Sequence, residues 1–232
     1  MTTTTAPEIR TTRFGRLLSV YQPIVDLRTR TVLGYEALAR FSDSAPDAAF
    51  AEAERCGQLV ELESQALQAA LAGLDDVPEG CFLSVNVSPA TVLSDGFGAL
   101  LAGRPVRRLV VEVVETTPVP CYDALVDALR PWRGAGLRVA VDDLGSGFAR
   151  LSHLTRLRPD VVKLDRALVS GLDGRPLAQA MAATLSRYAR TSGVMLVGEG
   201  VEEEAEAAAL TLAGVCVGQG WLFGRPGPLR SR

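Results

Sequence analysis

The feature that most constrains this chain is the alternation of short apolar runs with longer stretches of helical periodicity. The short runs have the length of strands, whereas apolar residues in the longer stretches recur with a period near 3.6, which indicates helices. Strands are expected at residues 18–25, 31–38, 82–86, 109–113, 137–141, 160–164, 194–197 and 215–218, and helices at 48–58, 59–72, 122–134, 175–191 and 202–213. Eight strands joined mostly by helices predict an α/β fold of the TIM-like (β/α)8 barrel class.

The link between the first two expected strands departs from a regular barrel. It consists of Asp-Leu-Arg-Thr-Arg at residues 26–30, which is too short for a crossover helix, because parallel strands need about a dozen connecting residues or more. We therefore expect an antiparallel first strand. The sequence contains no internal repeat and no linker, so we expect a disordered N-terminal tail at residues 1–12 and a single domain at residues 13–232.

Composition excludes several classes of function. The 232 residues carry a net charge of −3 with a pI near 5.3 and no basic stripe, so a nucleic-acid polymer is not an expected partner. Residues 207–224 lack charge, but four glycines interrupt them, which predicts a helix end, a short strand and a turn instead of a membrane segment. The N-terminus lacks the layout of a signal peptide, and the four scattered cysteines suit reduced thiols in the cytoplasm better than zinc ligands.

Polar residues stand at or near the carboxyl ends of seven successive expected strands. In chain order they are Glu36, Asn86, Glu112, Asp142, Lys163, Glu199 and Gln219. In a barrel these strand ends meet on one face, where active sites lie. One acidic residue after an apolar run is usually a solvated strand end, but seven in phase predict a functional site.

Several carboxylates at one barrel mouth would repel one another unless a cation separates them. Glu36, Glu112, Asp142, Asp143 and Glu199 would share this mouth. Oxygen ligands favour Mg²⁺ or Mn²⁺ over zinc. Asp142 and Asp143 can both point inward only if their strand has ended, and Asp142 would then bridge two ions of a site that activates water for phosphoryl displacement.

Three other residues need separate interpretation. Glu115 lies three positions after Glu112, so a regular strand cannot turn both inward, and we expect Glu115 either to tie down the loop after Asp143 or to be a surface acid. Lys163 is the only lysine among 24 basic residues, which indicates a task that a compact ammonium performs and a guanidinium does not. The single histidine, His153, is expected to be a surface or capping residue, so serine–histidine and cysteine–histidine chemistry is poorly supported.

The motifs in order resemble those of EAL-domain cyclic-di-GMP phosphodiesterases. The resemblance runs from residue 18 to residue 226 and includes Glu36-Ala-Leu-Ala-Arg40, which matches the signature that names the family. The other matching motifs are Tyr21-Gln-Pro-Ile-Val25, Asn86-Val-Ser88, Glu112-Val-Val-Glu115, Asp142-Asp143, Lys163-Leu-Asp165, Glu199-Gly-Val-Glu202 and Gln219-Gly-Trp-Leu-Phe-Gly-Arg-Pro226.

The resemblance implies the EAL fold, a homodimer and hydrolysis of cyclic-di-GMP to linear pGpG. It implies that Glu36, Asn86, Glu112 and Asp142 hold one Mg²⁺ or Mn²⁺ ion, and that Asp142 and Asp143 hold a second ion beside Glu199. It further implies that Lys163 positions the attacking water and that Gln22, Arg40 and Gln219 contact the substrate or the site.

The chain departs from the family pattern at three positions and in the segment Ser42–Ala51, which is shorter than typical, without losing a metal ligand. Leu144 stands where Phe is commoner, Val114 replaces a usual Thr, and Cys216 lies where Asp is common. Since the first two touch a loop that couples dimerisation to activity in the family, a catalytically weak or inactive cyclic-di-GMP receptor is an open alternative. A Schiff-base enzyme that uses Lys163 as its nucleophile is another, although it leaves the acidic cluster unexplained.

Overall fold

The computed structural model describes residues 9–114, 121–144 and 151–229, except for the side chains of 143, 144 and 151–153. The chain divides into two compact units. Unit 1 comprises Met1–Tyr21, Tyr35–Leu137 and Pro226–Arg232, and unit 2 comprises Gln22–Gly34 and Arg138–Arg225. Because β2 and β3 pass from one unit to the other, neither unit is a continuous segment of the sequence.

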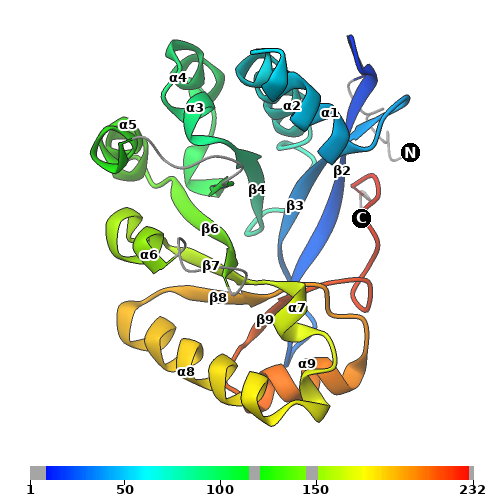
Figure 1. Cartoon of the computed structure of the whole chain (residues 1–232), viewed down its shortest axis with the longest axis vertical. Coiled ribbons are helices and arrows are strands. Elements are labelled where there is room, and N and C mark those ends of the chain that lie inside the picture. The colour runs from blue at the N-terminus through cyan, green and yellow to red at the C-terminus, as the bar shows by residue number, and fades with distance from the viewer. Residues whose placement is uncertain (1–8, 115–120, 145–150, 230–232) are drawn as a thin grey trace. The chain divides into compact units, whose positions relative to one another are not determined.

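The elements follow in the order shown by colour in Figure 1. The first part of the chain forms β1 (Arg10–Thr12), β2 (Gly15–Asp26), β3 (Val32–Phe41), α1 (Pro46–Arg55), α2 (Leu59–Ala72), β4 (Phe82–Val87), α3 (Pro89–Val92), α4 (Asp95–Leu101), the 3-10 turn η1 (Val106–Arg108), β5 (Leu109–Val113) and α5 (Tyr122–Gly134). The rest forms β6 (Arg138–Leu144), α6 (Leu151–Leu157), β7 (Val161–Leu164), α7 (Arg166–Val169), the 3-10 turn η3 (Leu172–Gly174), α8 (Pro176–Ser192), β8 (Met195–Gly198), α9 (Glu204–Leu212) and β9 (Val217–Gln219).

Strand pairing within each unit agrees with the predicted topology. In unit 1, β4 and β5 are parallel, and in unit 2, β6, β7, β8 and β9 are parallel neighbours. Every residue of β5 and of β7 is buried, as expected for parallel strands that are covered on both faces and therefore have nearly continuous apolar sequences.

The predicted antiparallel first strand is confirmed. Residues Ile24, Val25 and Asp26 of β2 pair antiparallel with β9. The chain then reverses in a tight turn, in which the Asp26 N–H donates to the Thr31 carbonyl oxygen (2.9 Å) and the Asp26 Oδ1 accepts from the Thr29 N–H (2.8 Å). An aspartate that accepts from backbone N–H groups further along the chain stabilises such a turn, which explains why so short a link is sufficient.

The structure contains elements that sequence periodicity did not predict. Strand β1 pairs antiparallel with β2, with Arg10 opposite Leu17, so residues 10–12 of the predicted N-terminal tail belong to the sheet. Helices α3 and α7 have four residues each, which is too short for an apolar repeat to be visible. The expected helix end, strand and turn at residues 207–224 are present as the end of α9, β9 and the turn after it.

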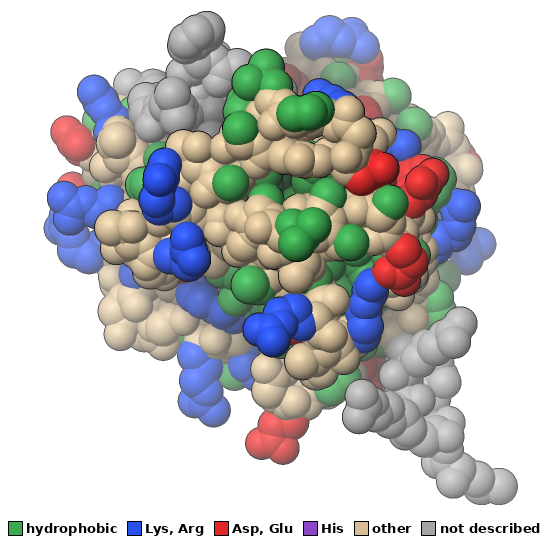
Figure 2. All heavy atoms as spheres, turned by 90° about the horizontal axis from the view of Figure 1, so that it is seen from below, with side chains coloured by type: hydrophobic (Ala, Val, Ile, Leu, Met, Phe, Trp, Pro, Cys, Tyr) green, Lys and Arg blue, Asp and Glu red, His purple; other side chains and the backbone are tan. Residues whose placement is uncertain are grey.

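Helix α8 places small side chains towards the core and larger apolar ones towards solvent. Ala178 and Ala182 are buried, whereas Leu177, Met181 and Tyr188 are exposed along one side of the helix. On the face formed by α8 and α9, hydrophobic side chains lie among basic ones (Figure 2). In the described part of the chain, no helix combines the length and the apolarity that a bilayer crossing requires.

Candidate active site

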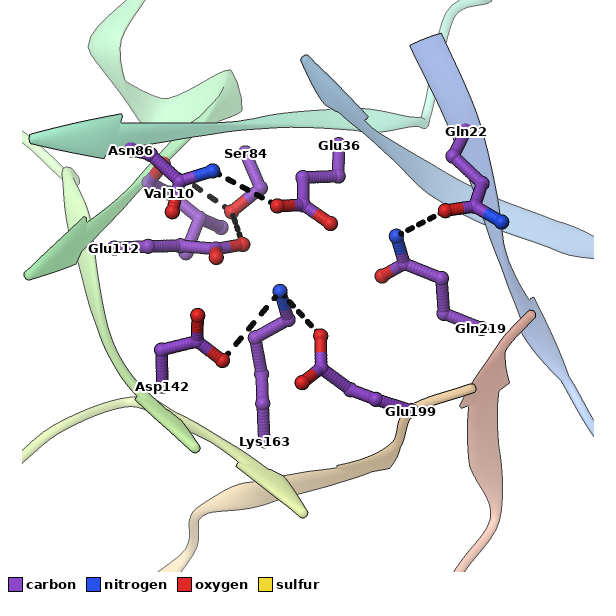
Figure 3. Close-up of polar contacts among 10 residues, drawn as sticks. All are labelled: Gln22, Glu36, Ser84, Asn86, Val110, Glu112, Asp142, Lys163, Glu199 and Gln219. Atoms are coloured by element: carbon purple, nitrogen blue, oxygen red, sulfur yellow. Dashed lines mark hydrogen bonds and ion pairs between the residues drawn. The ribbon is translucent and has the colours of Figure 1, made fainter. Parts of the chain in front are cut away.

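Three predicted ligands in unit 1 lie on β3, β4 and β5. Glu36 is 6% exposed and Glu112 is 1% exposed, and Asn86 lies directly opposite Glu112 in the parallel pair of β4 and β5. The Asn86 Nδ2 donates to the Glu36 Oε1 at 2.8 Å, so the amide oxygen points away from Glu36 (Figure 3). This hydrogen bond fixes the orientation of the Asn86 amide group and leaves its oxygen available as a ligand.

Ser84 is a site residue that sequence reasoning missed. Its Oγ donates to the Glu112 Oε1 at 2.5 Å, and the serine is 1% exposed (Figure 3). Residues two apart on a strand point to the same face, so Ser84 shares a face of β4 with Asn86. A hydroxyl that donates to a carboxylate fixes its orientation. The sequence did contain a signal for this residue, because Ser84 is polar and stands two positions before the predicted ligand Asn86.

In unit 2, the buried ammonium of Lys163 lies between two carboxylates. Lys163 is on β7 and 1% exposed; its Nζ lies 2.6 Å from the Glu199 Oε1 and 3.9 Å from the Asp142 Oδ1 (Figure 3). The Glu199 N–H donates to the Leu164 carbonyl oxygen at 3.1 Å, which ties the residue after β8 to β7. Because burying an unpaired charge is costly, these carboxylates stabilise the lysine in its position.

The carboxyl end of β6 contains an irregularity at the predicted pair of aspartates. Val141 pairs with Val162 and Leu144 with Leu164, so three steps along β6 correspond to two along β7. Such a bulge breaks the regular alternation of side chains. The expectation that the strand ends before both aspartates is therefore wrong, since β6 continues to Leu144; the register shift is what interrupts the alternation there.

The two predicted substrate-binding glutamines are joined in unit 2. The Gln219 Nε2 donates to the Gln22 Oε1 at 3.1 Å, and the Gln22 Nε2 donates to the Gly224 carbonyl oxygen at 3.1 Å (Figure 3). Gly220 allows this arrangement, because a Cβ there would lie 2.0 Å from the Val201 carbonyl oxygen. A side chain at position 220 would thus displace the backbone that carries Gln219.

The buried carboxylate of Glu206 holds the loop that follows Glu199. It accepts hydrogen bonds from the backbone N–H groups of Gly171 (2.9 Å), Glu202 (2.8 Å) and Glu203 (3.1 Å). Burial by itself raises the pKa of Glu206, but these hydrogen bonds and the positive charge of Arg166 together outweigh it and lower the pKa below its ordinary value. Glu206 thereby fixes the start of α9 and the loop before it.

The remaining predicted residues lie apart from these contacts or outside the description. Arg40 is four residues after Glu36 on β3, and its Nη1 donates to the Ala39 carbonyl oxygen at 2.8 Å. Glu115 and the side chains of Asp143 and His153 lie outside the described residues.

The donors present are chemically suited to a hard divalent cation. Considered separately, unit 1 has the carboxylates of Glu36 and Glu112 and the amide of Asn86, and unit 2 has the carboxylates of Asp142 and Glu199. Oxygen donors of this kind are the ligands that Mg²⁺ and Mn²⁺ prefer. Among the residues that the structure describes, no group of three or more His, Cys, Asp or Glu side chains is placed to hold a metal ion.

Comparison with known proteins identifies the family. A family model described as the EAL domain matches residues 8–226. The chain belongs to the EAL domain family. The resemblance inferred from the sequence motifs is thus confirmed.

Two solved structures have the same fold as this chain. The structure of Klebsiella pneumoniae BlrP1 in a manganese and cyclic-di-GMP complex is 31% identical with a TM-score of 0.82, over 98% of this chain and 59% of that one. The structure of the PaMucR phosphodiesterase in complex with c-di-GMP is 29% identical with a TM-score of 0.80, over 91% of this chain and 92% of that one. The predicted fold class, a TIM-like (β/α)8 barrel of the EAL type, is confirmed.

A relative compared by sequence carries a functional name. The probable cyclic di-GMP phosphodiesterase PdeG of Escherichia coli is 29% identical over 227 residues, which is 91% of this chain and 45% of PdeG. The chain therefore spans less than two thirds of both PdeG and BlrP1.

Proposed function

We propose that this EAL domain hydrolyses cyclic-di-GMP to linear pGpG with the help of one or two divalent ions, Mg²⁺ or Mn²⁺. The observation that carries the proposal is the buried Lys163 ammonium, 2.6 Å from the Glu199 carboxylate and 3.9 Å from the Asp142 carboxylate. Desolvating a charged triad is expensive, and replacing such groups by apolar residues is often neutral or stabilising. A chemical role for the ammonium accounts for its presence.

The proposed ion ligands are those that the sequence predicts. They are Glu36, Asn86, Glu112, Asp142 and Asp143. When bound, such ions supply activation of water and stabilisation of the attacking and leaving oxygens of an in-line displacement. The contacts of Asn86 with Glu36 and of Ser84 with Glu112 support this assignment, because they fix the orientation of oxygen donors.

In the proposed reaction, Lys163 orients the attacking water by donating a hydrogen bond from Nζ. The water oxygen forms a bond to phosphorus and the water gives up a proton, while the bond from phosphorus to one ribose oxygen breaks and that oxygen takes up a proton. Asp142 and Glu199 keep Nζ in place during this step. Gln22, Arg40 and Gln219 would contact the substrate, and the hydrogen bond between the two glutamines supports a fixed orientation of both amides.

The decisive experiment measures cyclic-di-GMP turnover by the wild type and by Glu36→Ala, with and without Mg²⁺ or Mn²⁺. We expect pGpG formation by the wild type, loss of it with a chelator, recovery on adding the ion, and no turnover by Glu36→Ala. The matched control is Glu61→Ala, because Glu61 is exposed on α2. Absence of pGpG from metal-saturated wild-type protein would refute the proposed hydrolysis. Binding of cyclic-di-GMP without turnover would instead identify a receptor.

We also propose, from the family resemblance, that the protein is a cytoplasmic homodimer. Sedimentation velocity of the purified chain should give twice the monomer mass of 24.6 kDa. A single species at the monomer mass, at concentrations where turnover is measured, would contradict the homodimer but leave the proposed hydrolysis unaffected.

A further inference from the structure

Helix α2 carries a buried carboxylate to which the proposed reaction assigns no role. Glu63 is 8% exposed, and the other buried residues of α2 are Leu and Ala. Burial raises the pKa of Glu63, and hydrogen bonds from Ser88 and Thr91 counteract this only in part. A carboxylate at such a position is costly to bury unless hydrogen bonds compensate.

The hydrogen bonds of Glu63 all go to the chain segment that follows β4. Its Oε2 accepts from the Ser88 N–H at 3.0 Å, from the Ser88 Oγ at 2.6 Å and from the Thr91 Oγ1. Ser88 is also the N-cap of α3, since its Oγ accepts from the Thr91 N–H at 3.3 Å. A four-residue helix is not stable by itself, so the hydrogen bonds of Glu63 contribute, with the burial of Pro89 and Val92, to fixing α3 and the junction before it.

This junction begins two residues after Asn86. On its other side, the Val114 N–H donates to the Val87 carbonyl oxygen at 3.0 Å, which holds the end of β4 against the chain after β5. Val87 and Ser88 are therefore both anchored, and the backbone at Asn86 has little freedom to rotate. The Asn86 side chain keeps its 2.8 Å hydrogen bond to Glu36 from this fixed backbone.

We propose that Glu63 is a positioning residue, which holds the junction between β4 and α3 and thereby keeps the Asn86 amide oxygen aimed at a divalent cation. The inference rests on the proposed function, because it presupposes that Asn86 is a ligand. Glu63 itself touches neither the ion nor the substrate. Its effect passes through Ser88 and the two residues before it.

The test measures Mn²⁺ affinity of the purified full chain by titration calorimetry, together with turnover at increasing Mn²⁺. Glu63→Gln keeps the size of the side chain but replaces one acceptor oxygen by an NH₂ donor. Loss of a group that orients a metal ligand typically weakens metal affinity by about 10- to 100-fold, and we expect a weakening in this range. We also expect turnover to recover towards wild type at saturating Mn²⁺. Glu61→Gln, on the exposed side of the same helix, should bind Mn²⁺ like the wild type.

The outcomes separate this inference from the proposed function. If the wild type binds Mn²⁺ and forms pGpG, and folded Glu63→Gln binds Mn²⁺ equally well, the positioning role is wrong and the phosphodiesterase proposal stands. If the wild type neither binds Mn²⁺ nor hydrolyses cyclic-di-GMP, both are wrong. If Glu63→Gln does not fold, Ser88→Ala removes the Ser88 hydroxyl contact with Glu63 together with the N-cap of α3, keeps the contacts of Glu63 with the Ser88 N–H and the Thr91 hydroxyl, and decides by the same criterion of Mn²⁺ affinity.

Discussion

Replacing Lys163 by arginine tests whether the site requires a compact ammonium group or only a positive charge. The substitution keeps a cation between Asp142 and Glu199, but it exchanges a compact ammonium for a planar guanidinium. Lys163 is 1% exposed on a strand that is paired on both sides. The new side chain therefore cannot move into solvent, and its larger head group must occupy the space in which the attacking water is proposed to bind.

The expected magnitudes follow from this burial. Adding atoms to a well-packed interior costs about 1–3 kcal/mol, which is less than the roughly 5–15 kcal/mol by which a domain is stable, so Lys163→Arg should fold. Misplacing one donor to the reacting atoms typically lowers kcat by about 10²- to 10³-fold. Lys163→Met should be less stable than Lys163→Arg. Removing the cation leaves Asp142 and Glu199 without this partner, which lowers the free energy of unfolding by about 3–5 kcal/mol.

The assay combines urea unfolding with kcat and KM for cyclic-di-GMP, measured by chromatography of pGpG. We expect Lys163→Arg to retain binding and to lose at least about 10²-fold in kcat, as for loss of an interaction made in the transition state. Arg187→Lys, an exchange of basic residues at an exposed position of α8, is the control. A Lys163→Arg variant with wild-type kcat would refute the argument that the site requires a compact ammonium.

Three further predictions concern residues that support the site. Ser84→Ala should weaken Mn²⁺ binding by about 10-fold or more, because Glu112 loses the hydroxyl that orients it; calorimetry with unchanged affinity would contradict this. The wild type should lose unfolding free energy more steeply than Glu206→Gln as pH falls below about 4.5, since the lowered pKa of Glu206 means that the unfolded chain takes up this proton first; parallel curves in acid urea unfolding would exclude the effect. Gly220→Ala should destabilise the fold by about 1–3 kcal/mol or more, because its Cβ would lie 2.0 Å from a backbone oxygen. By contrast, Gly134→Ala, in α5 and with nothing within 4 Å of its Cβ, should not lower the unfolding temperature, because alanine is more stable than glycine in a helix.

The sequence was sufficient for most of the secondary structure. Helices α2 and α5 and strand β5 have the predicted bounds, because periodicity is a property of neighbouring residues and the apolar runs are long enough to show it. The polar residues at the strand ends could be recognised too, because each stands at or near the end of such an apolar run. Strand β1 and helices α3 and α7 could not, since three or four residues are too few to establish a period.

By itself, the sequence determined which residue types stand at the ends of the strands and that Lys163 is exceptional. Only the tertiary structure decided the partners: Ser84 for Glu112, Glu63 for Ser88, and Asp142 with Glu199 for Lys163. Ser84 and Glu112 are 28 residues apart, and Glu63 and Ser88 are 25 residues apart. Contacts at such separations depend on how strands and helices pack, which local patterns do not encode. The register shift in β6 is likewise visible only against its neighbour β7.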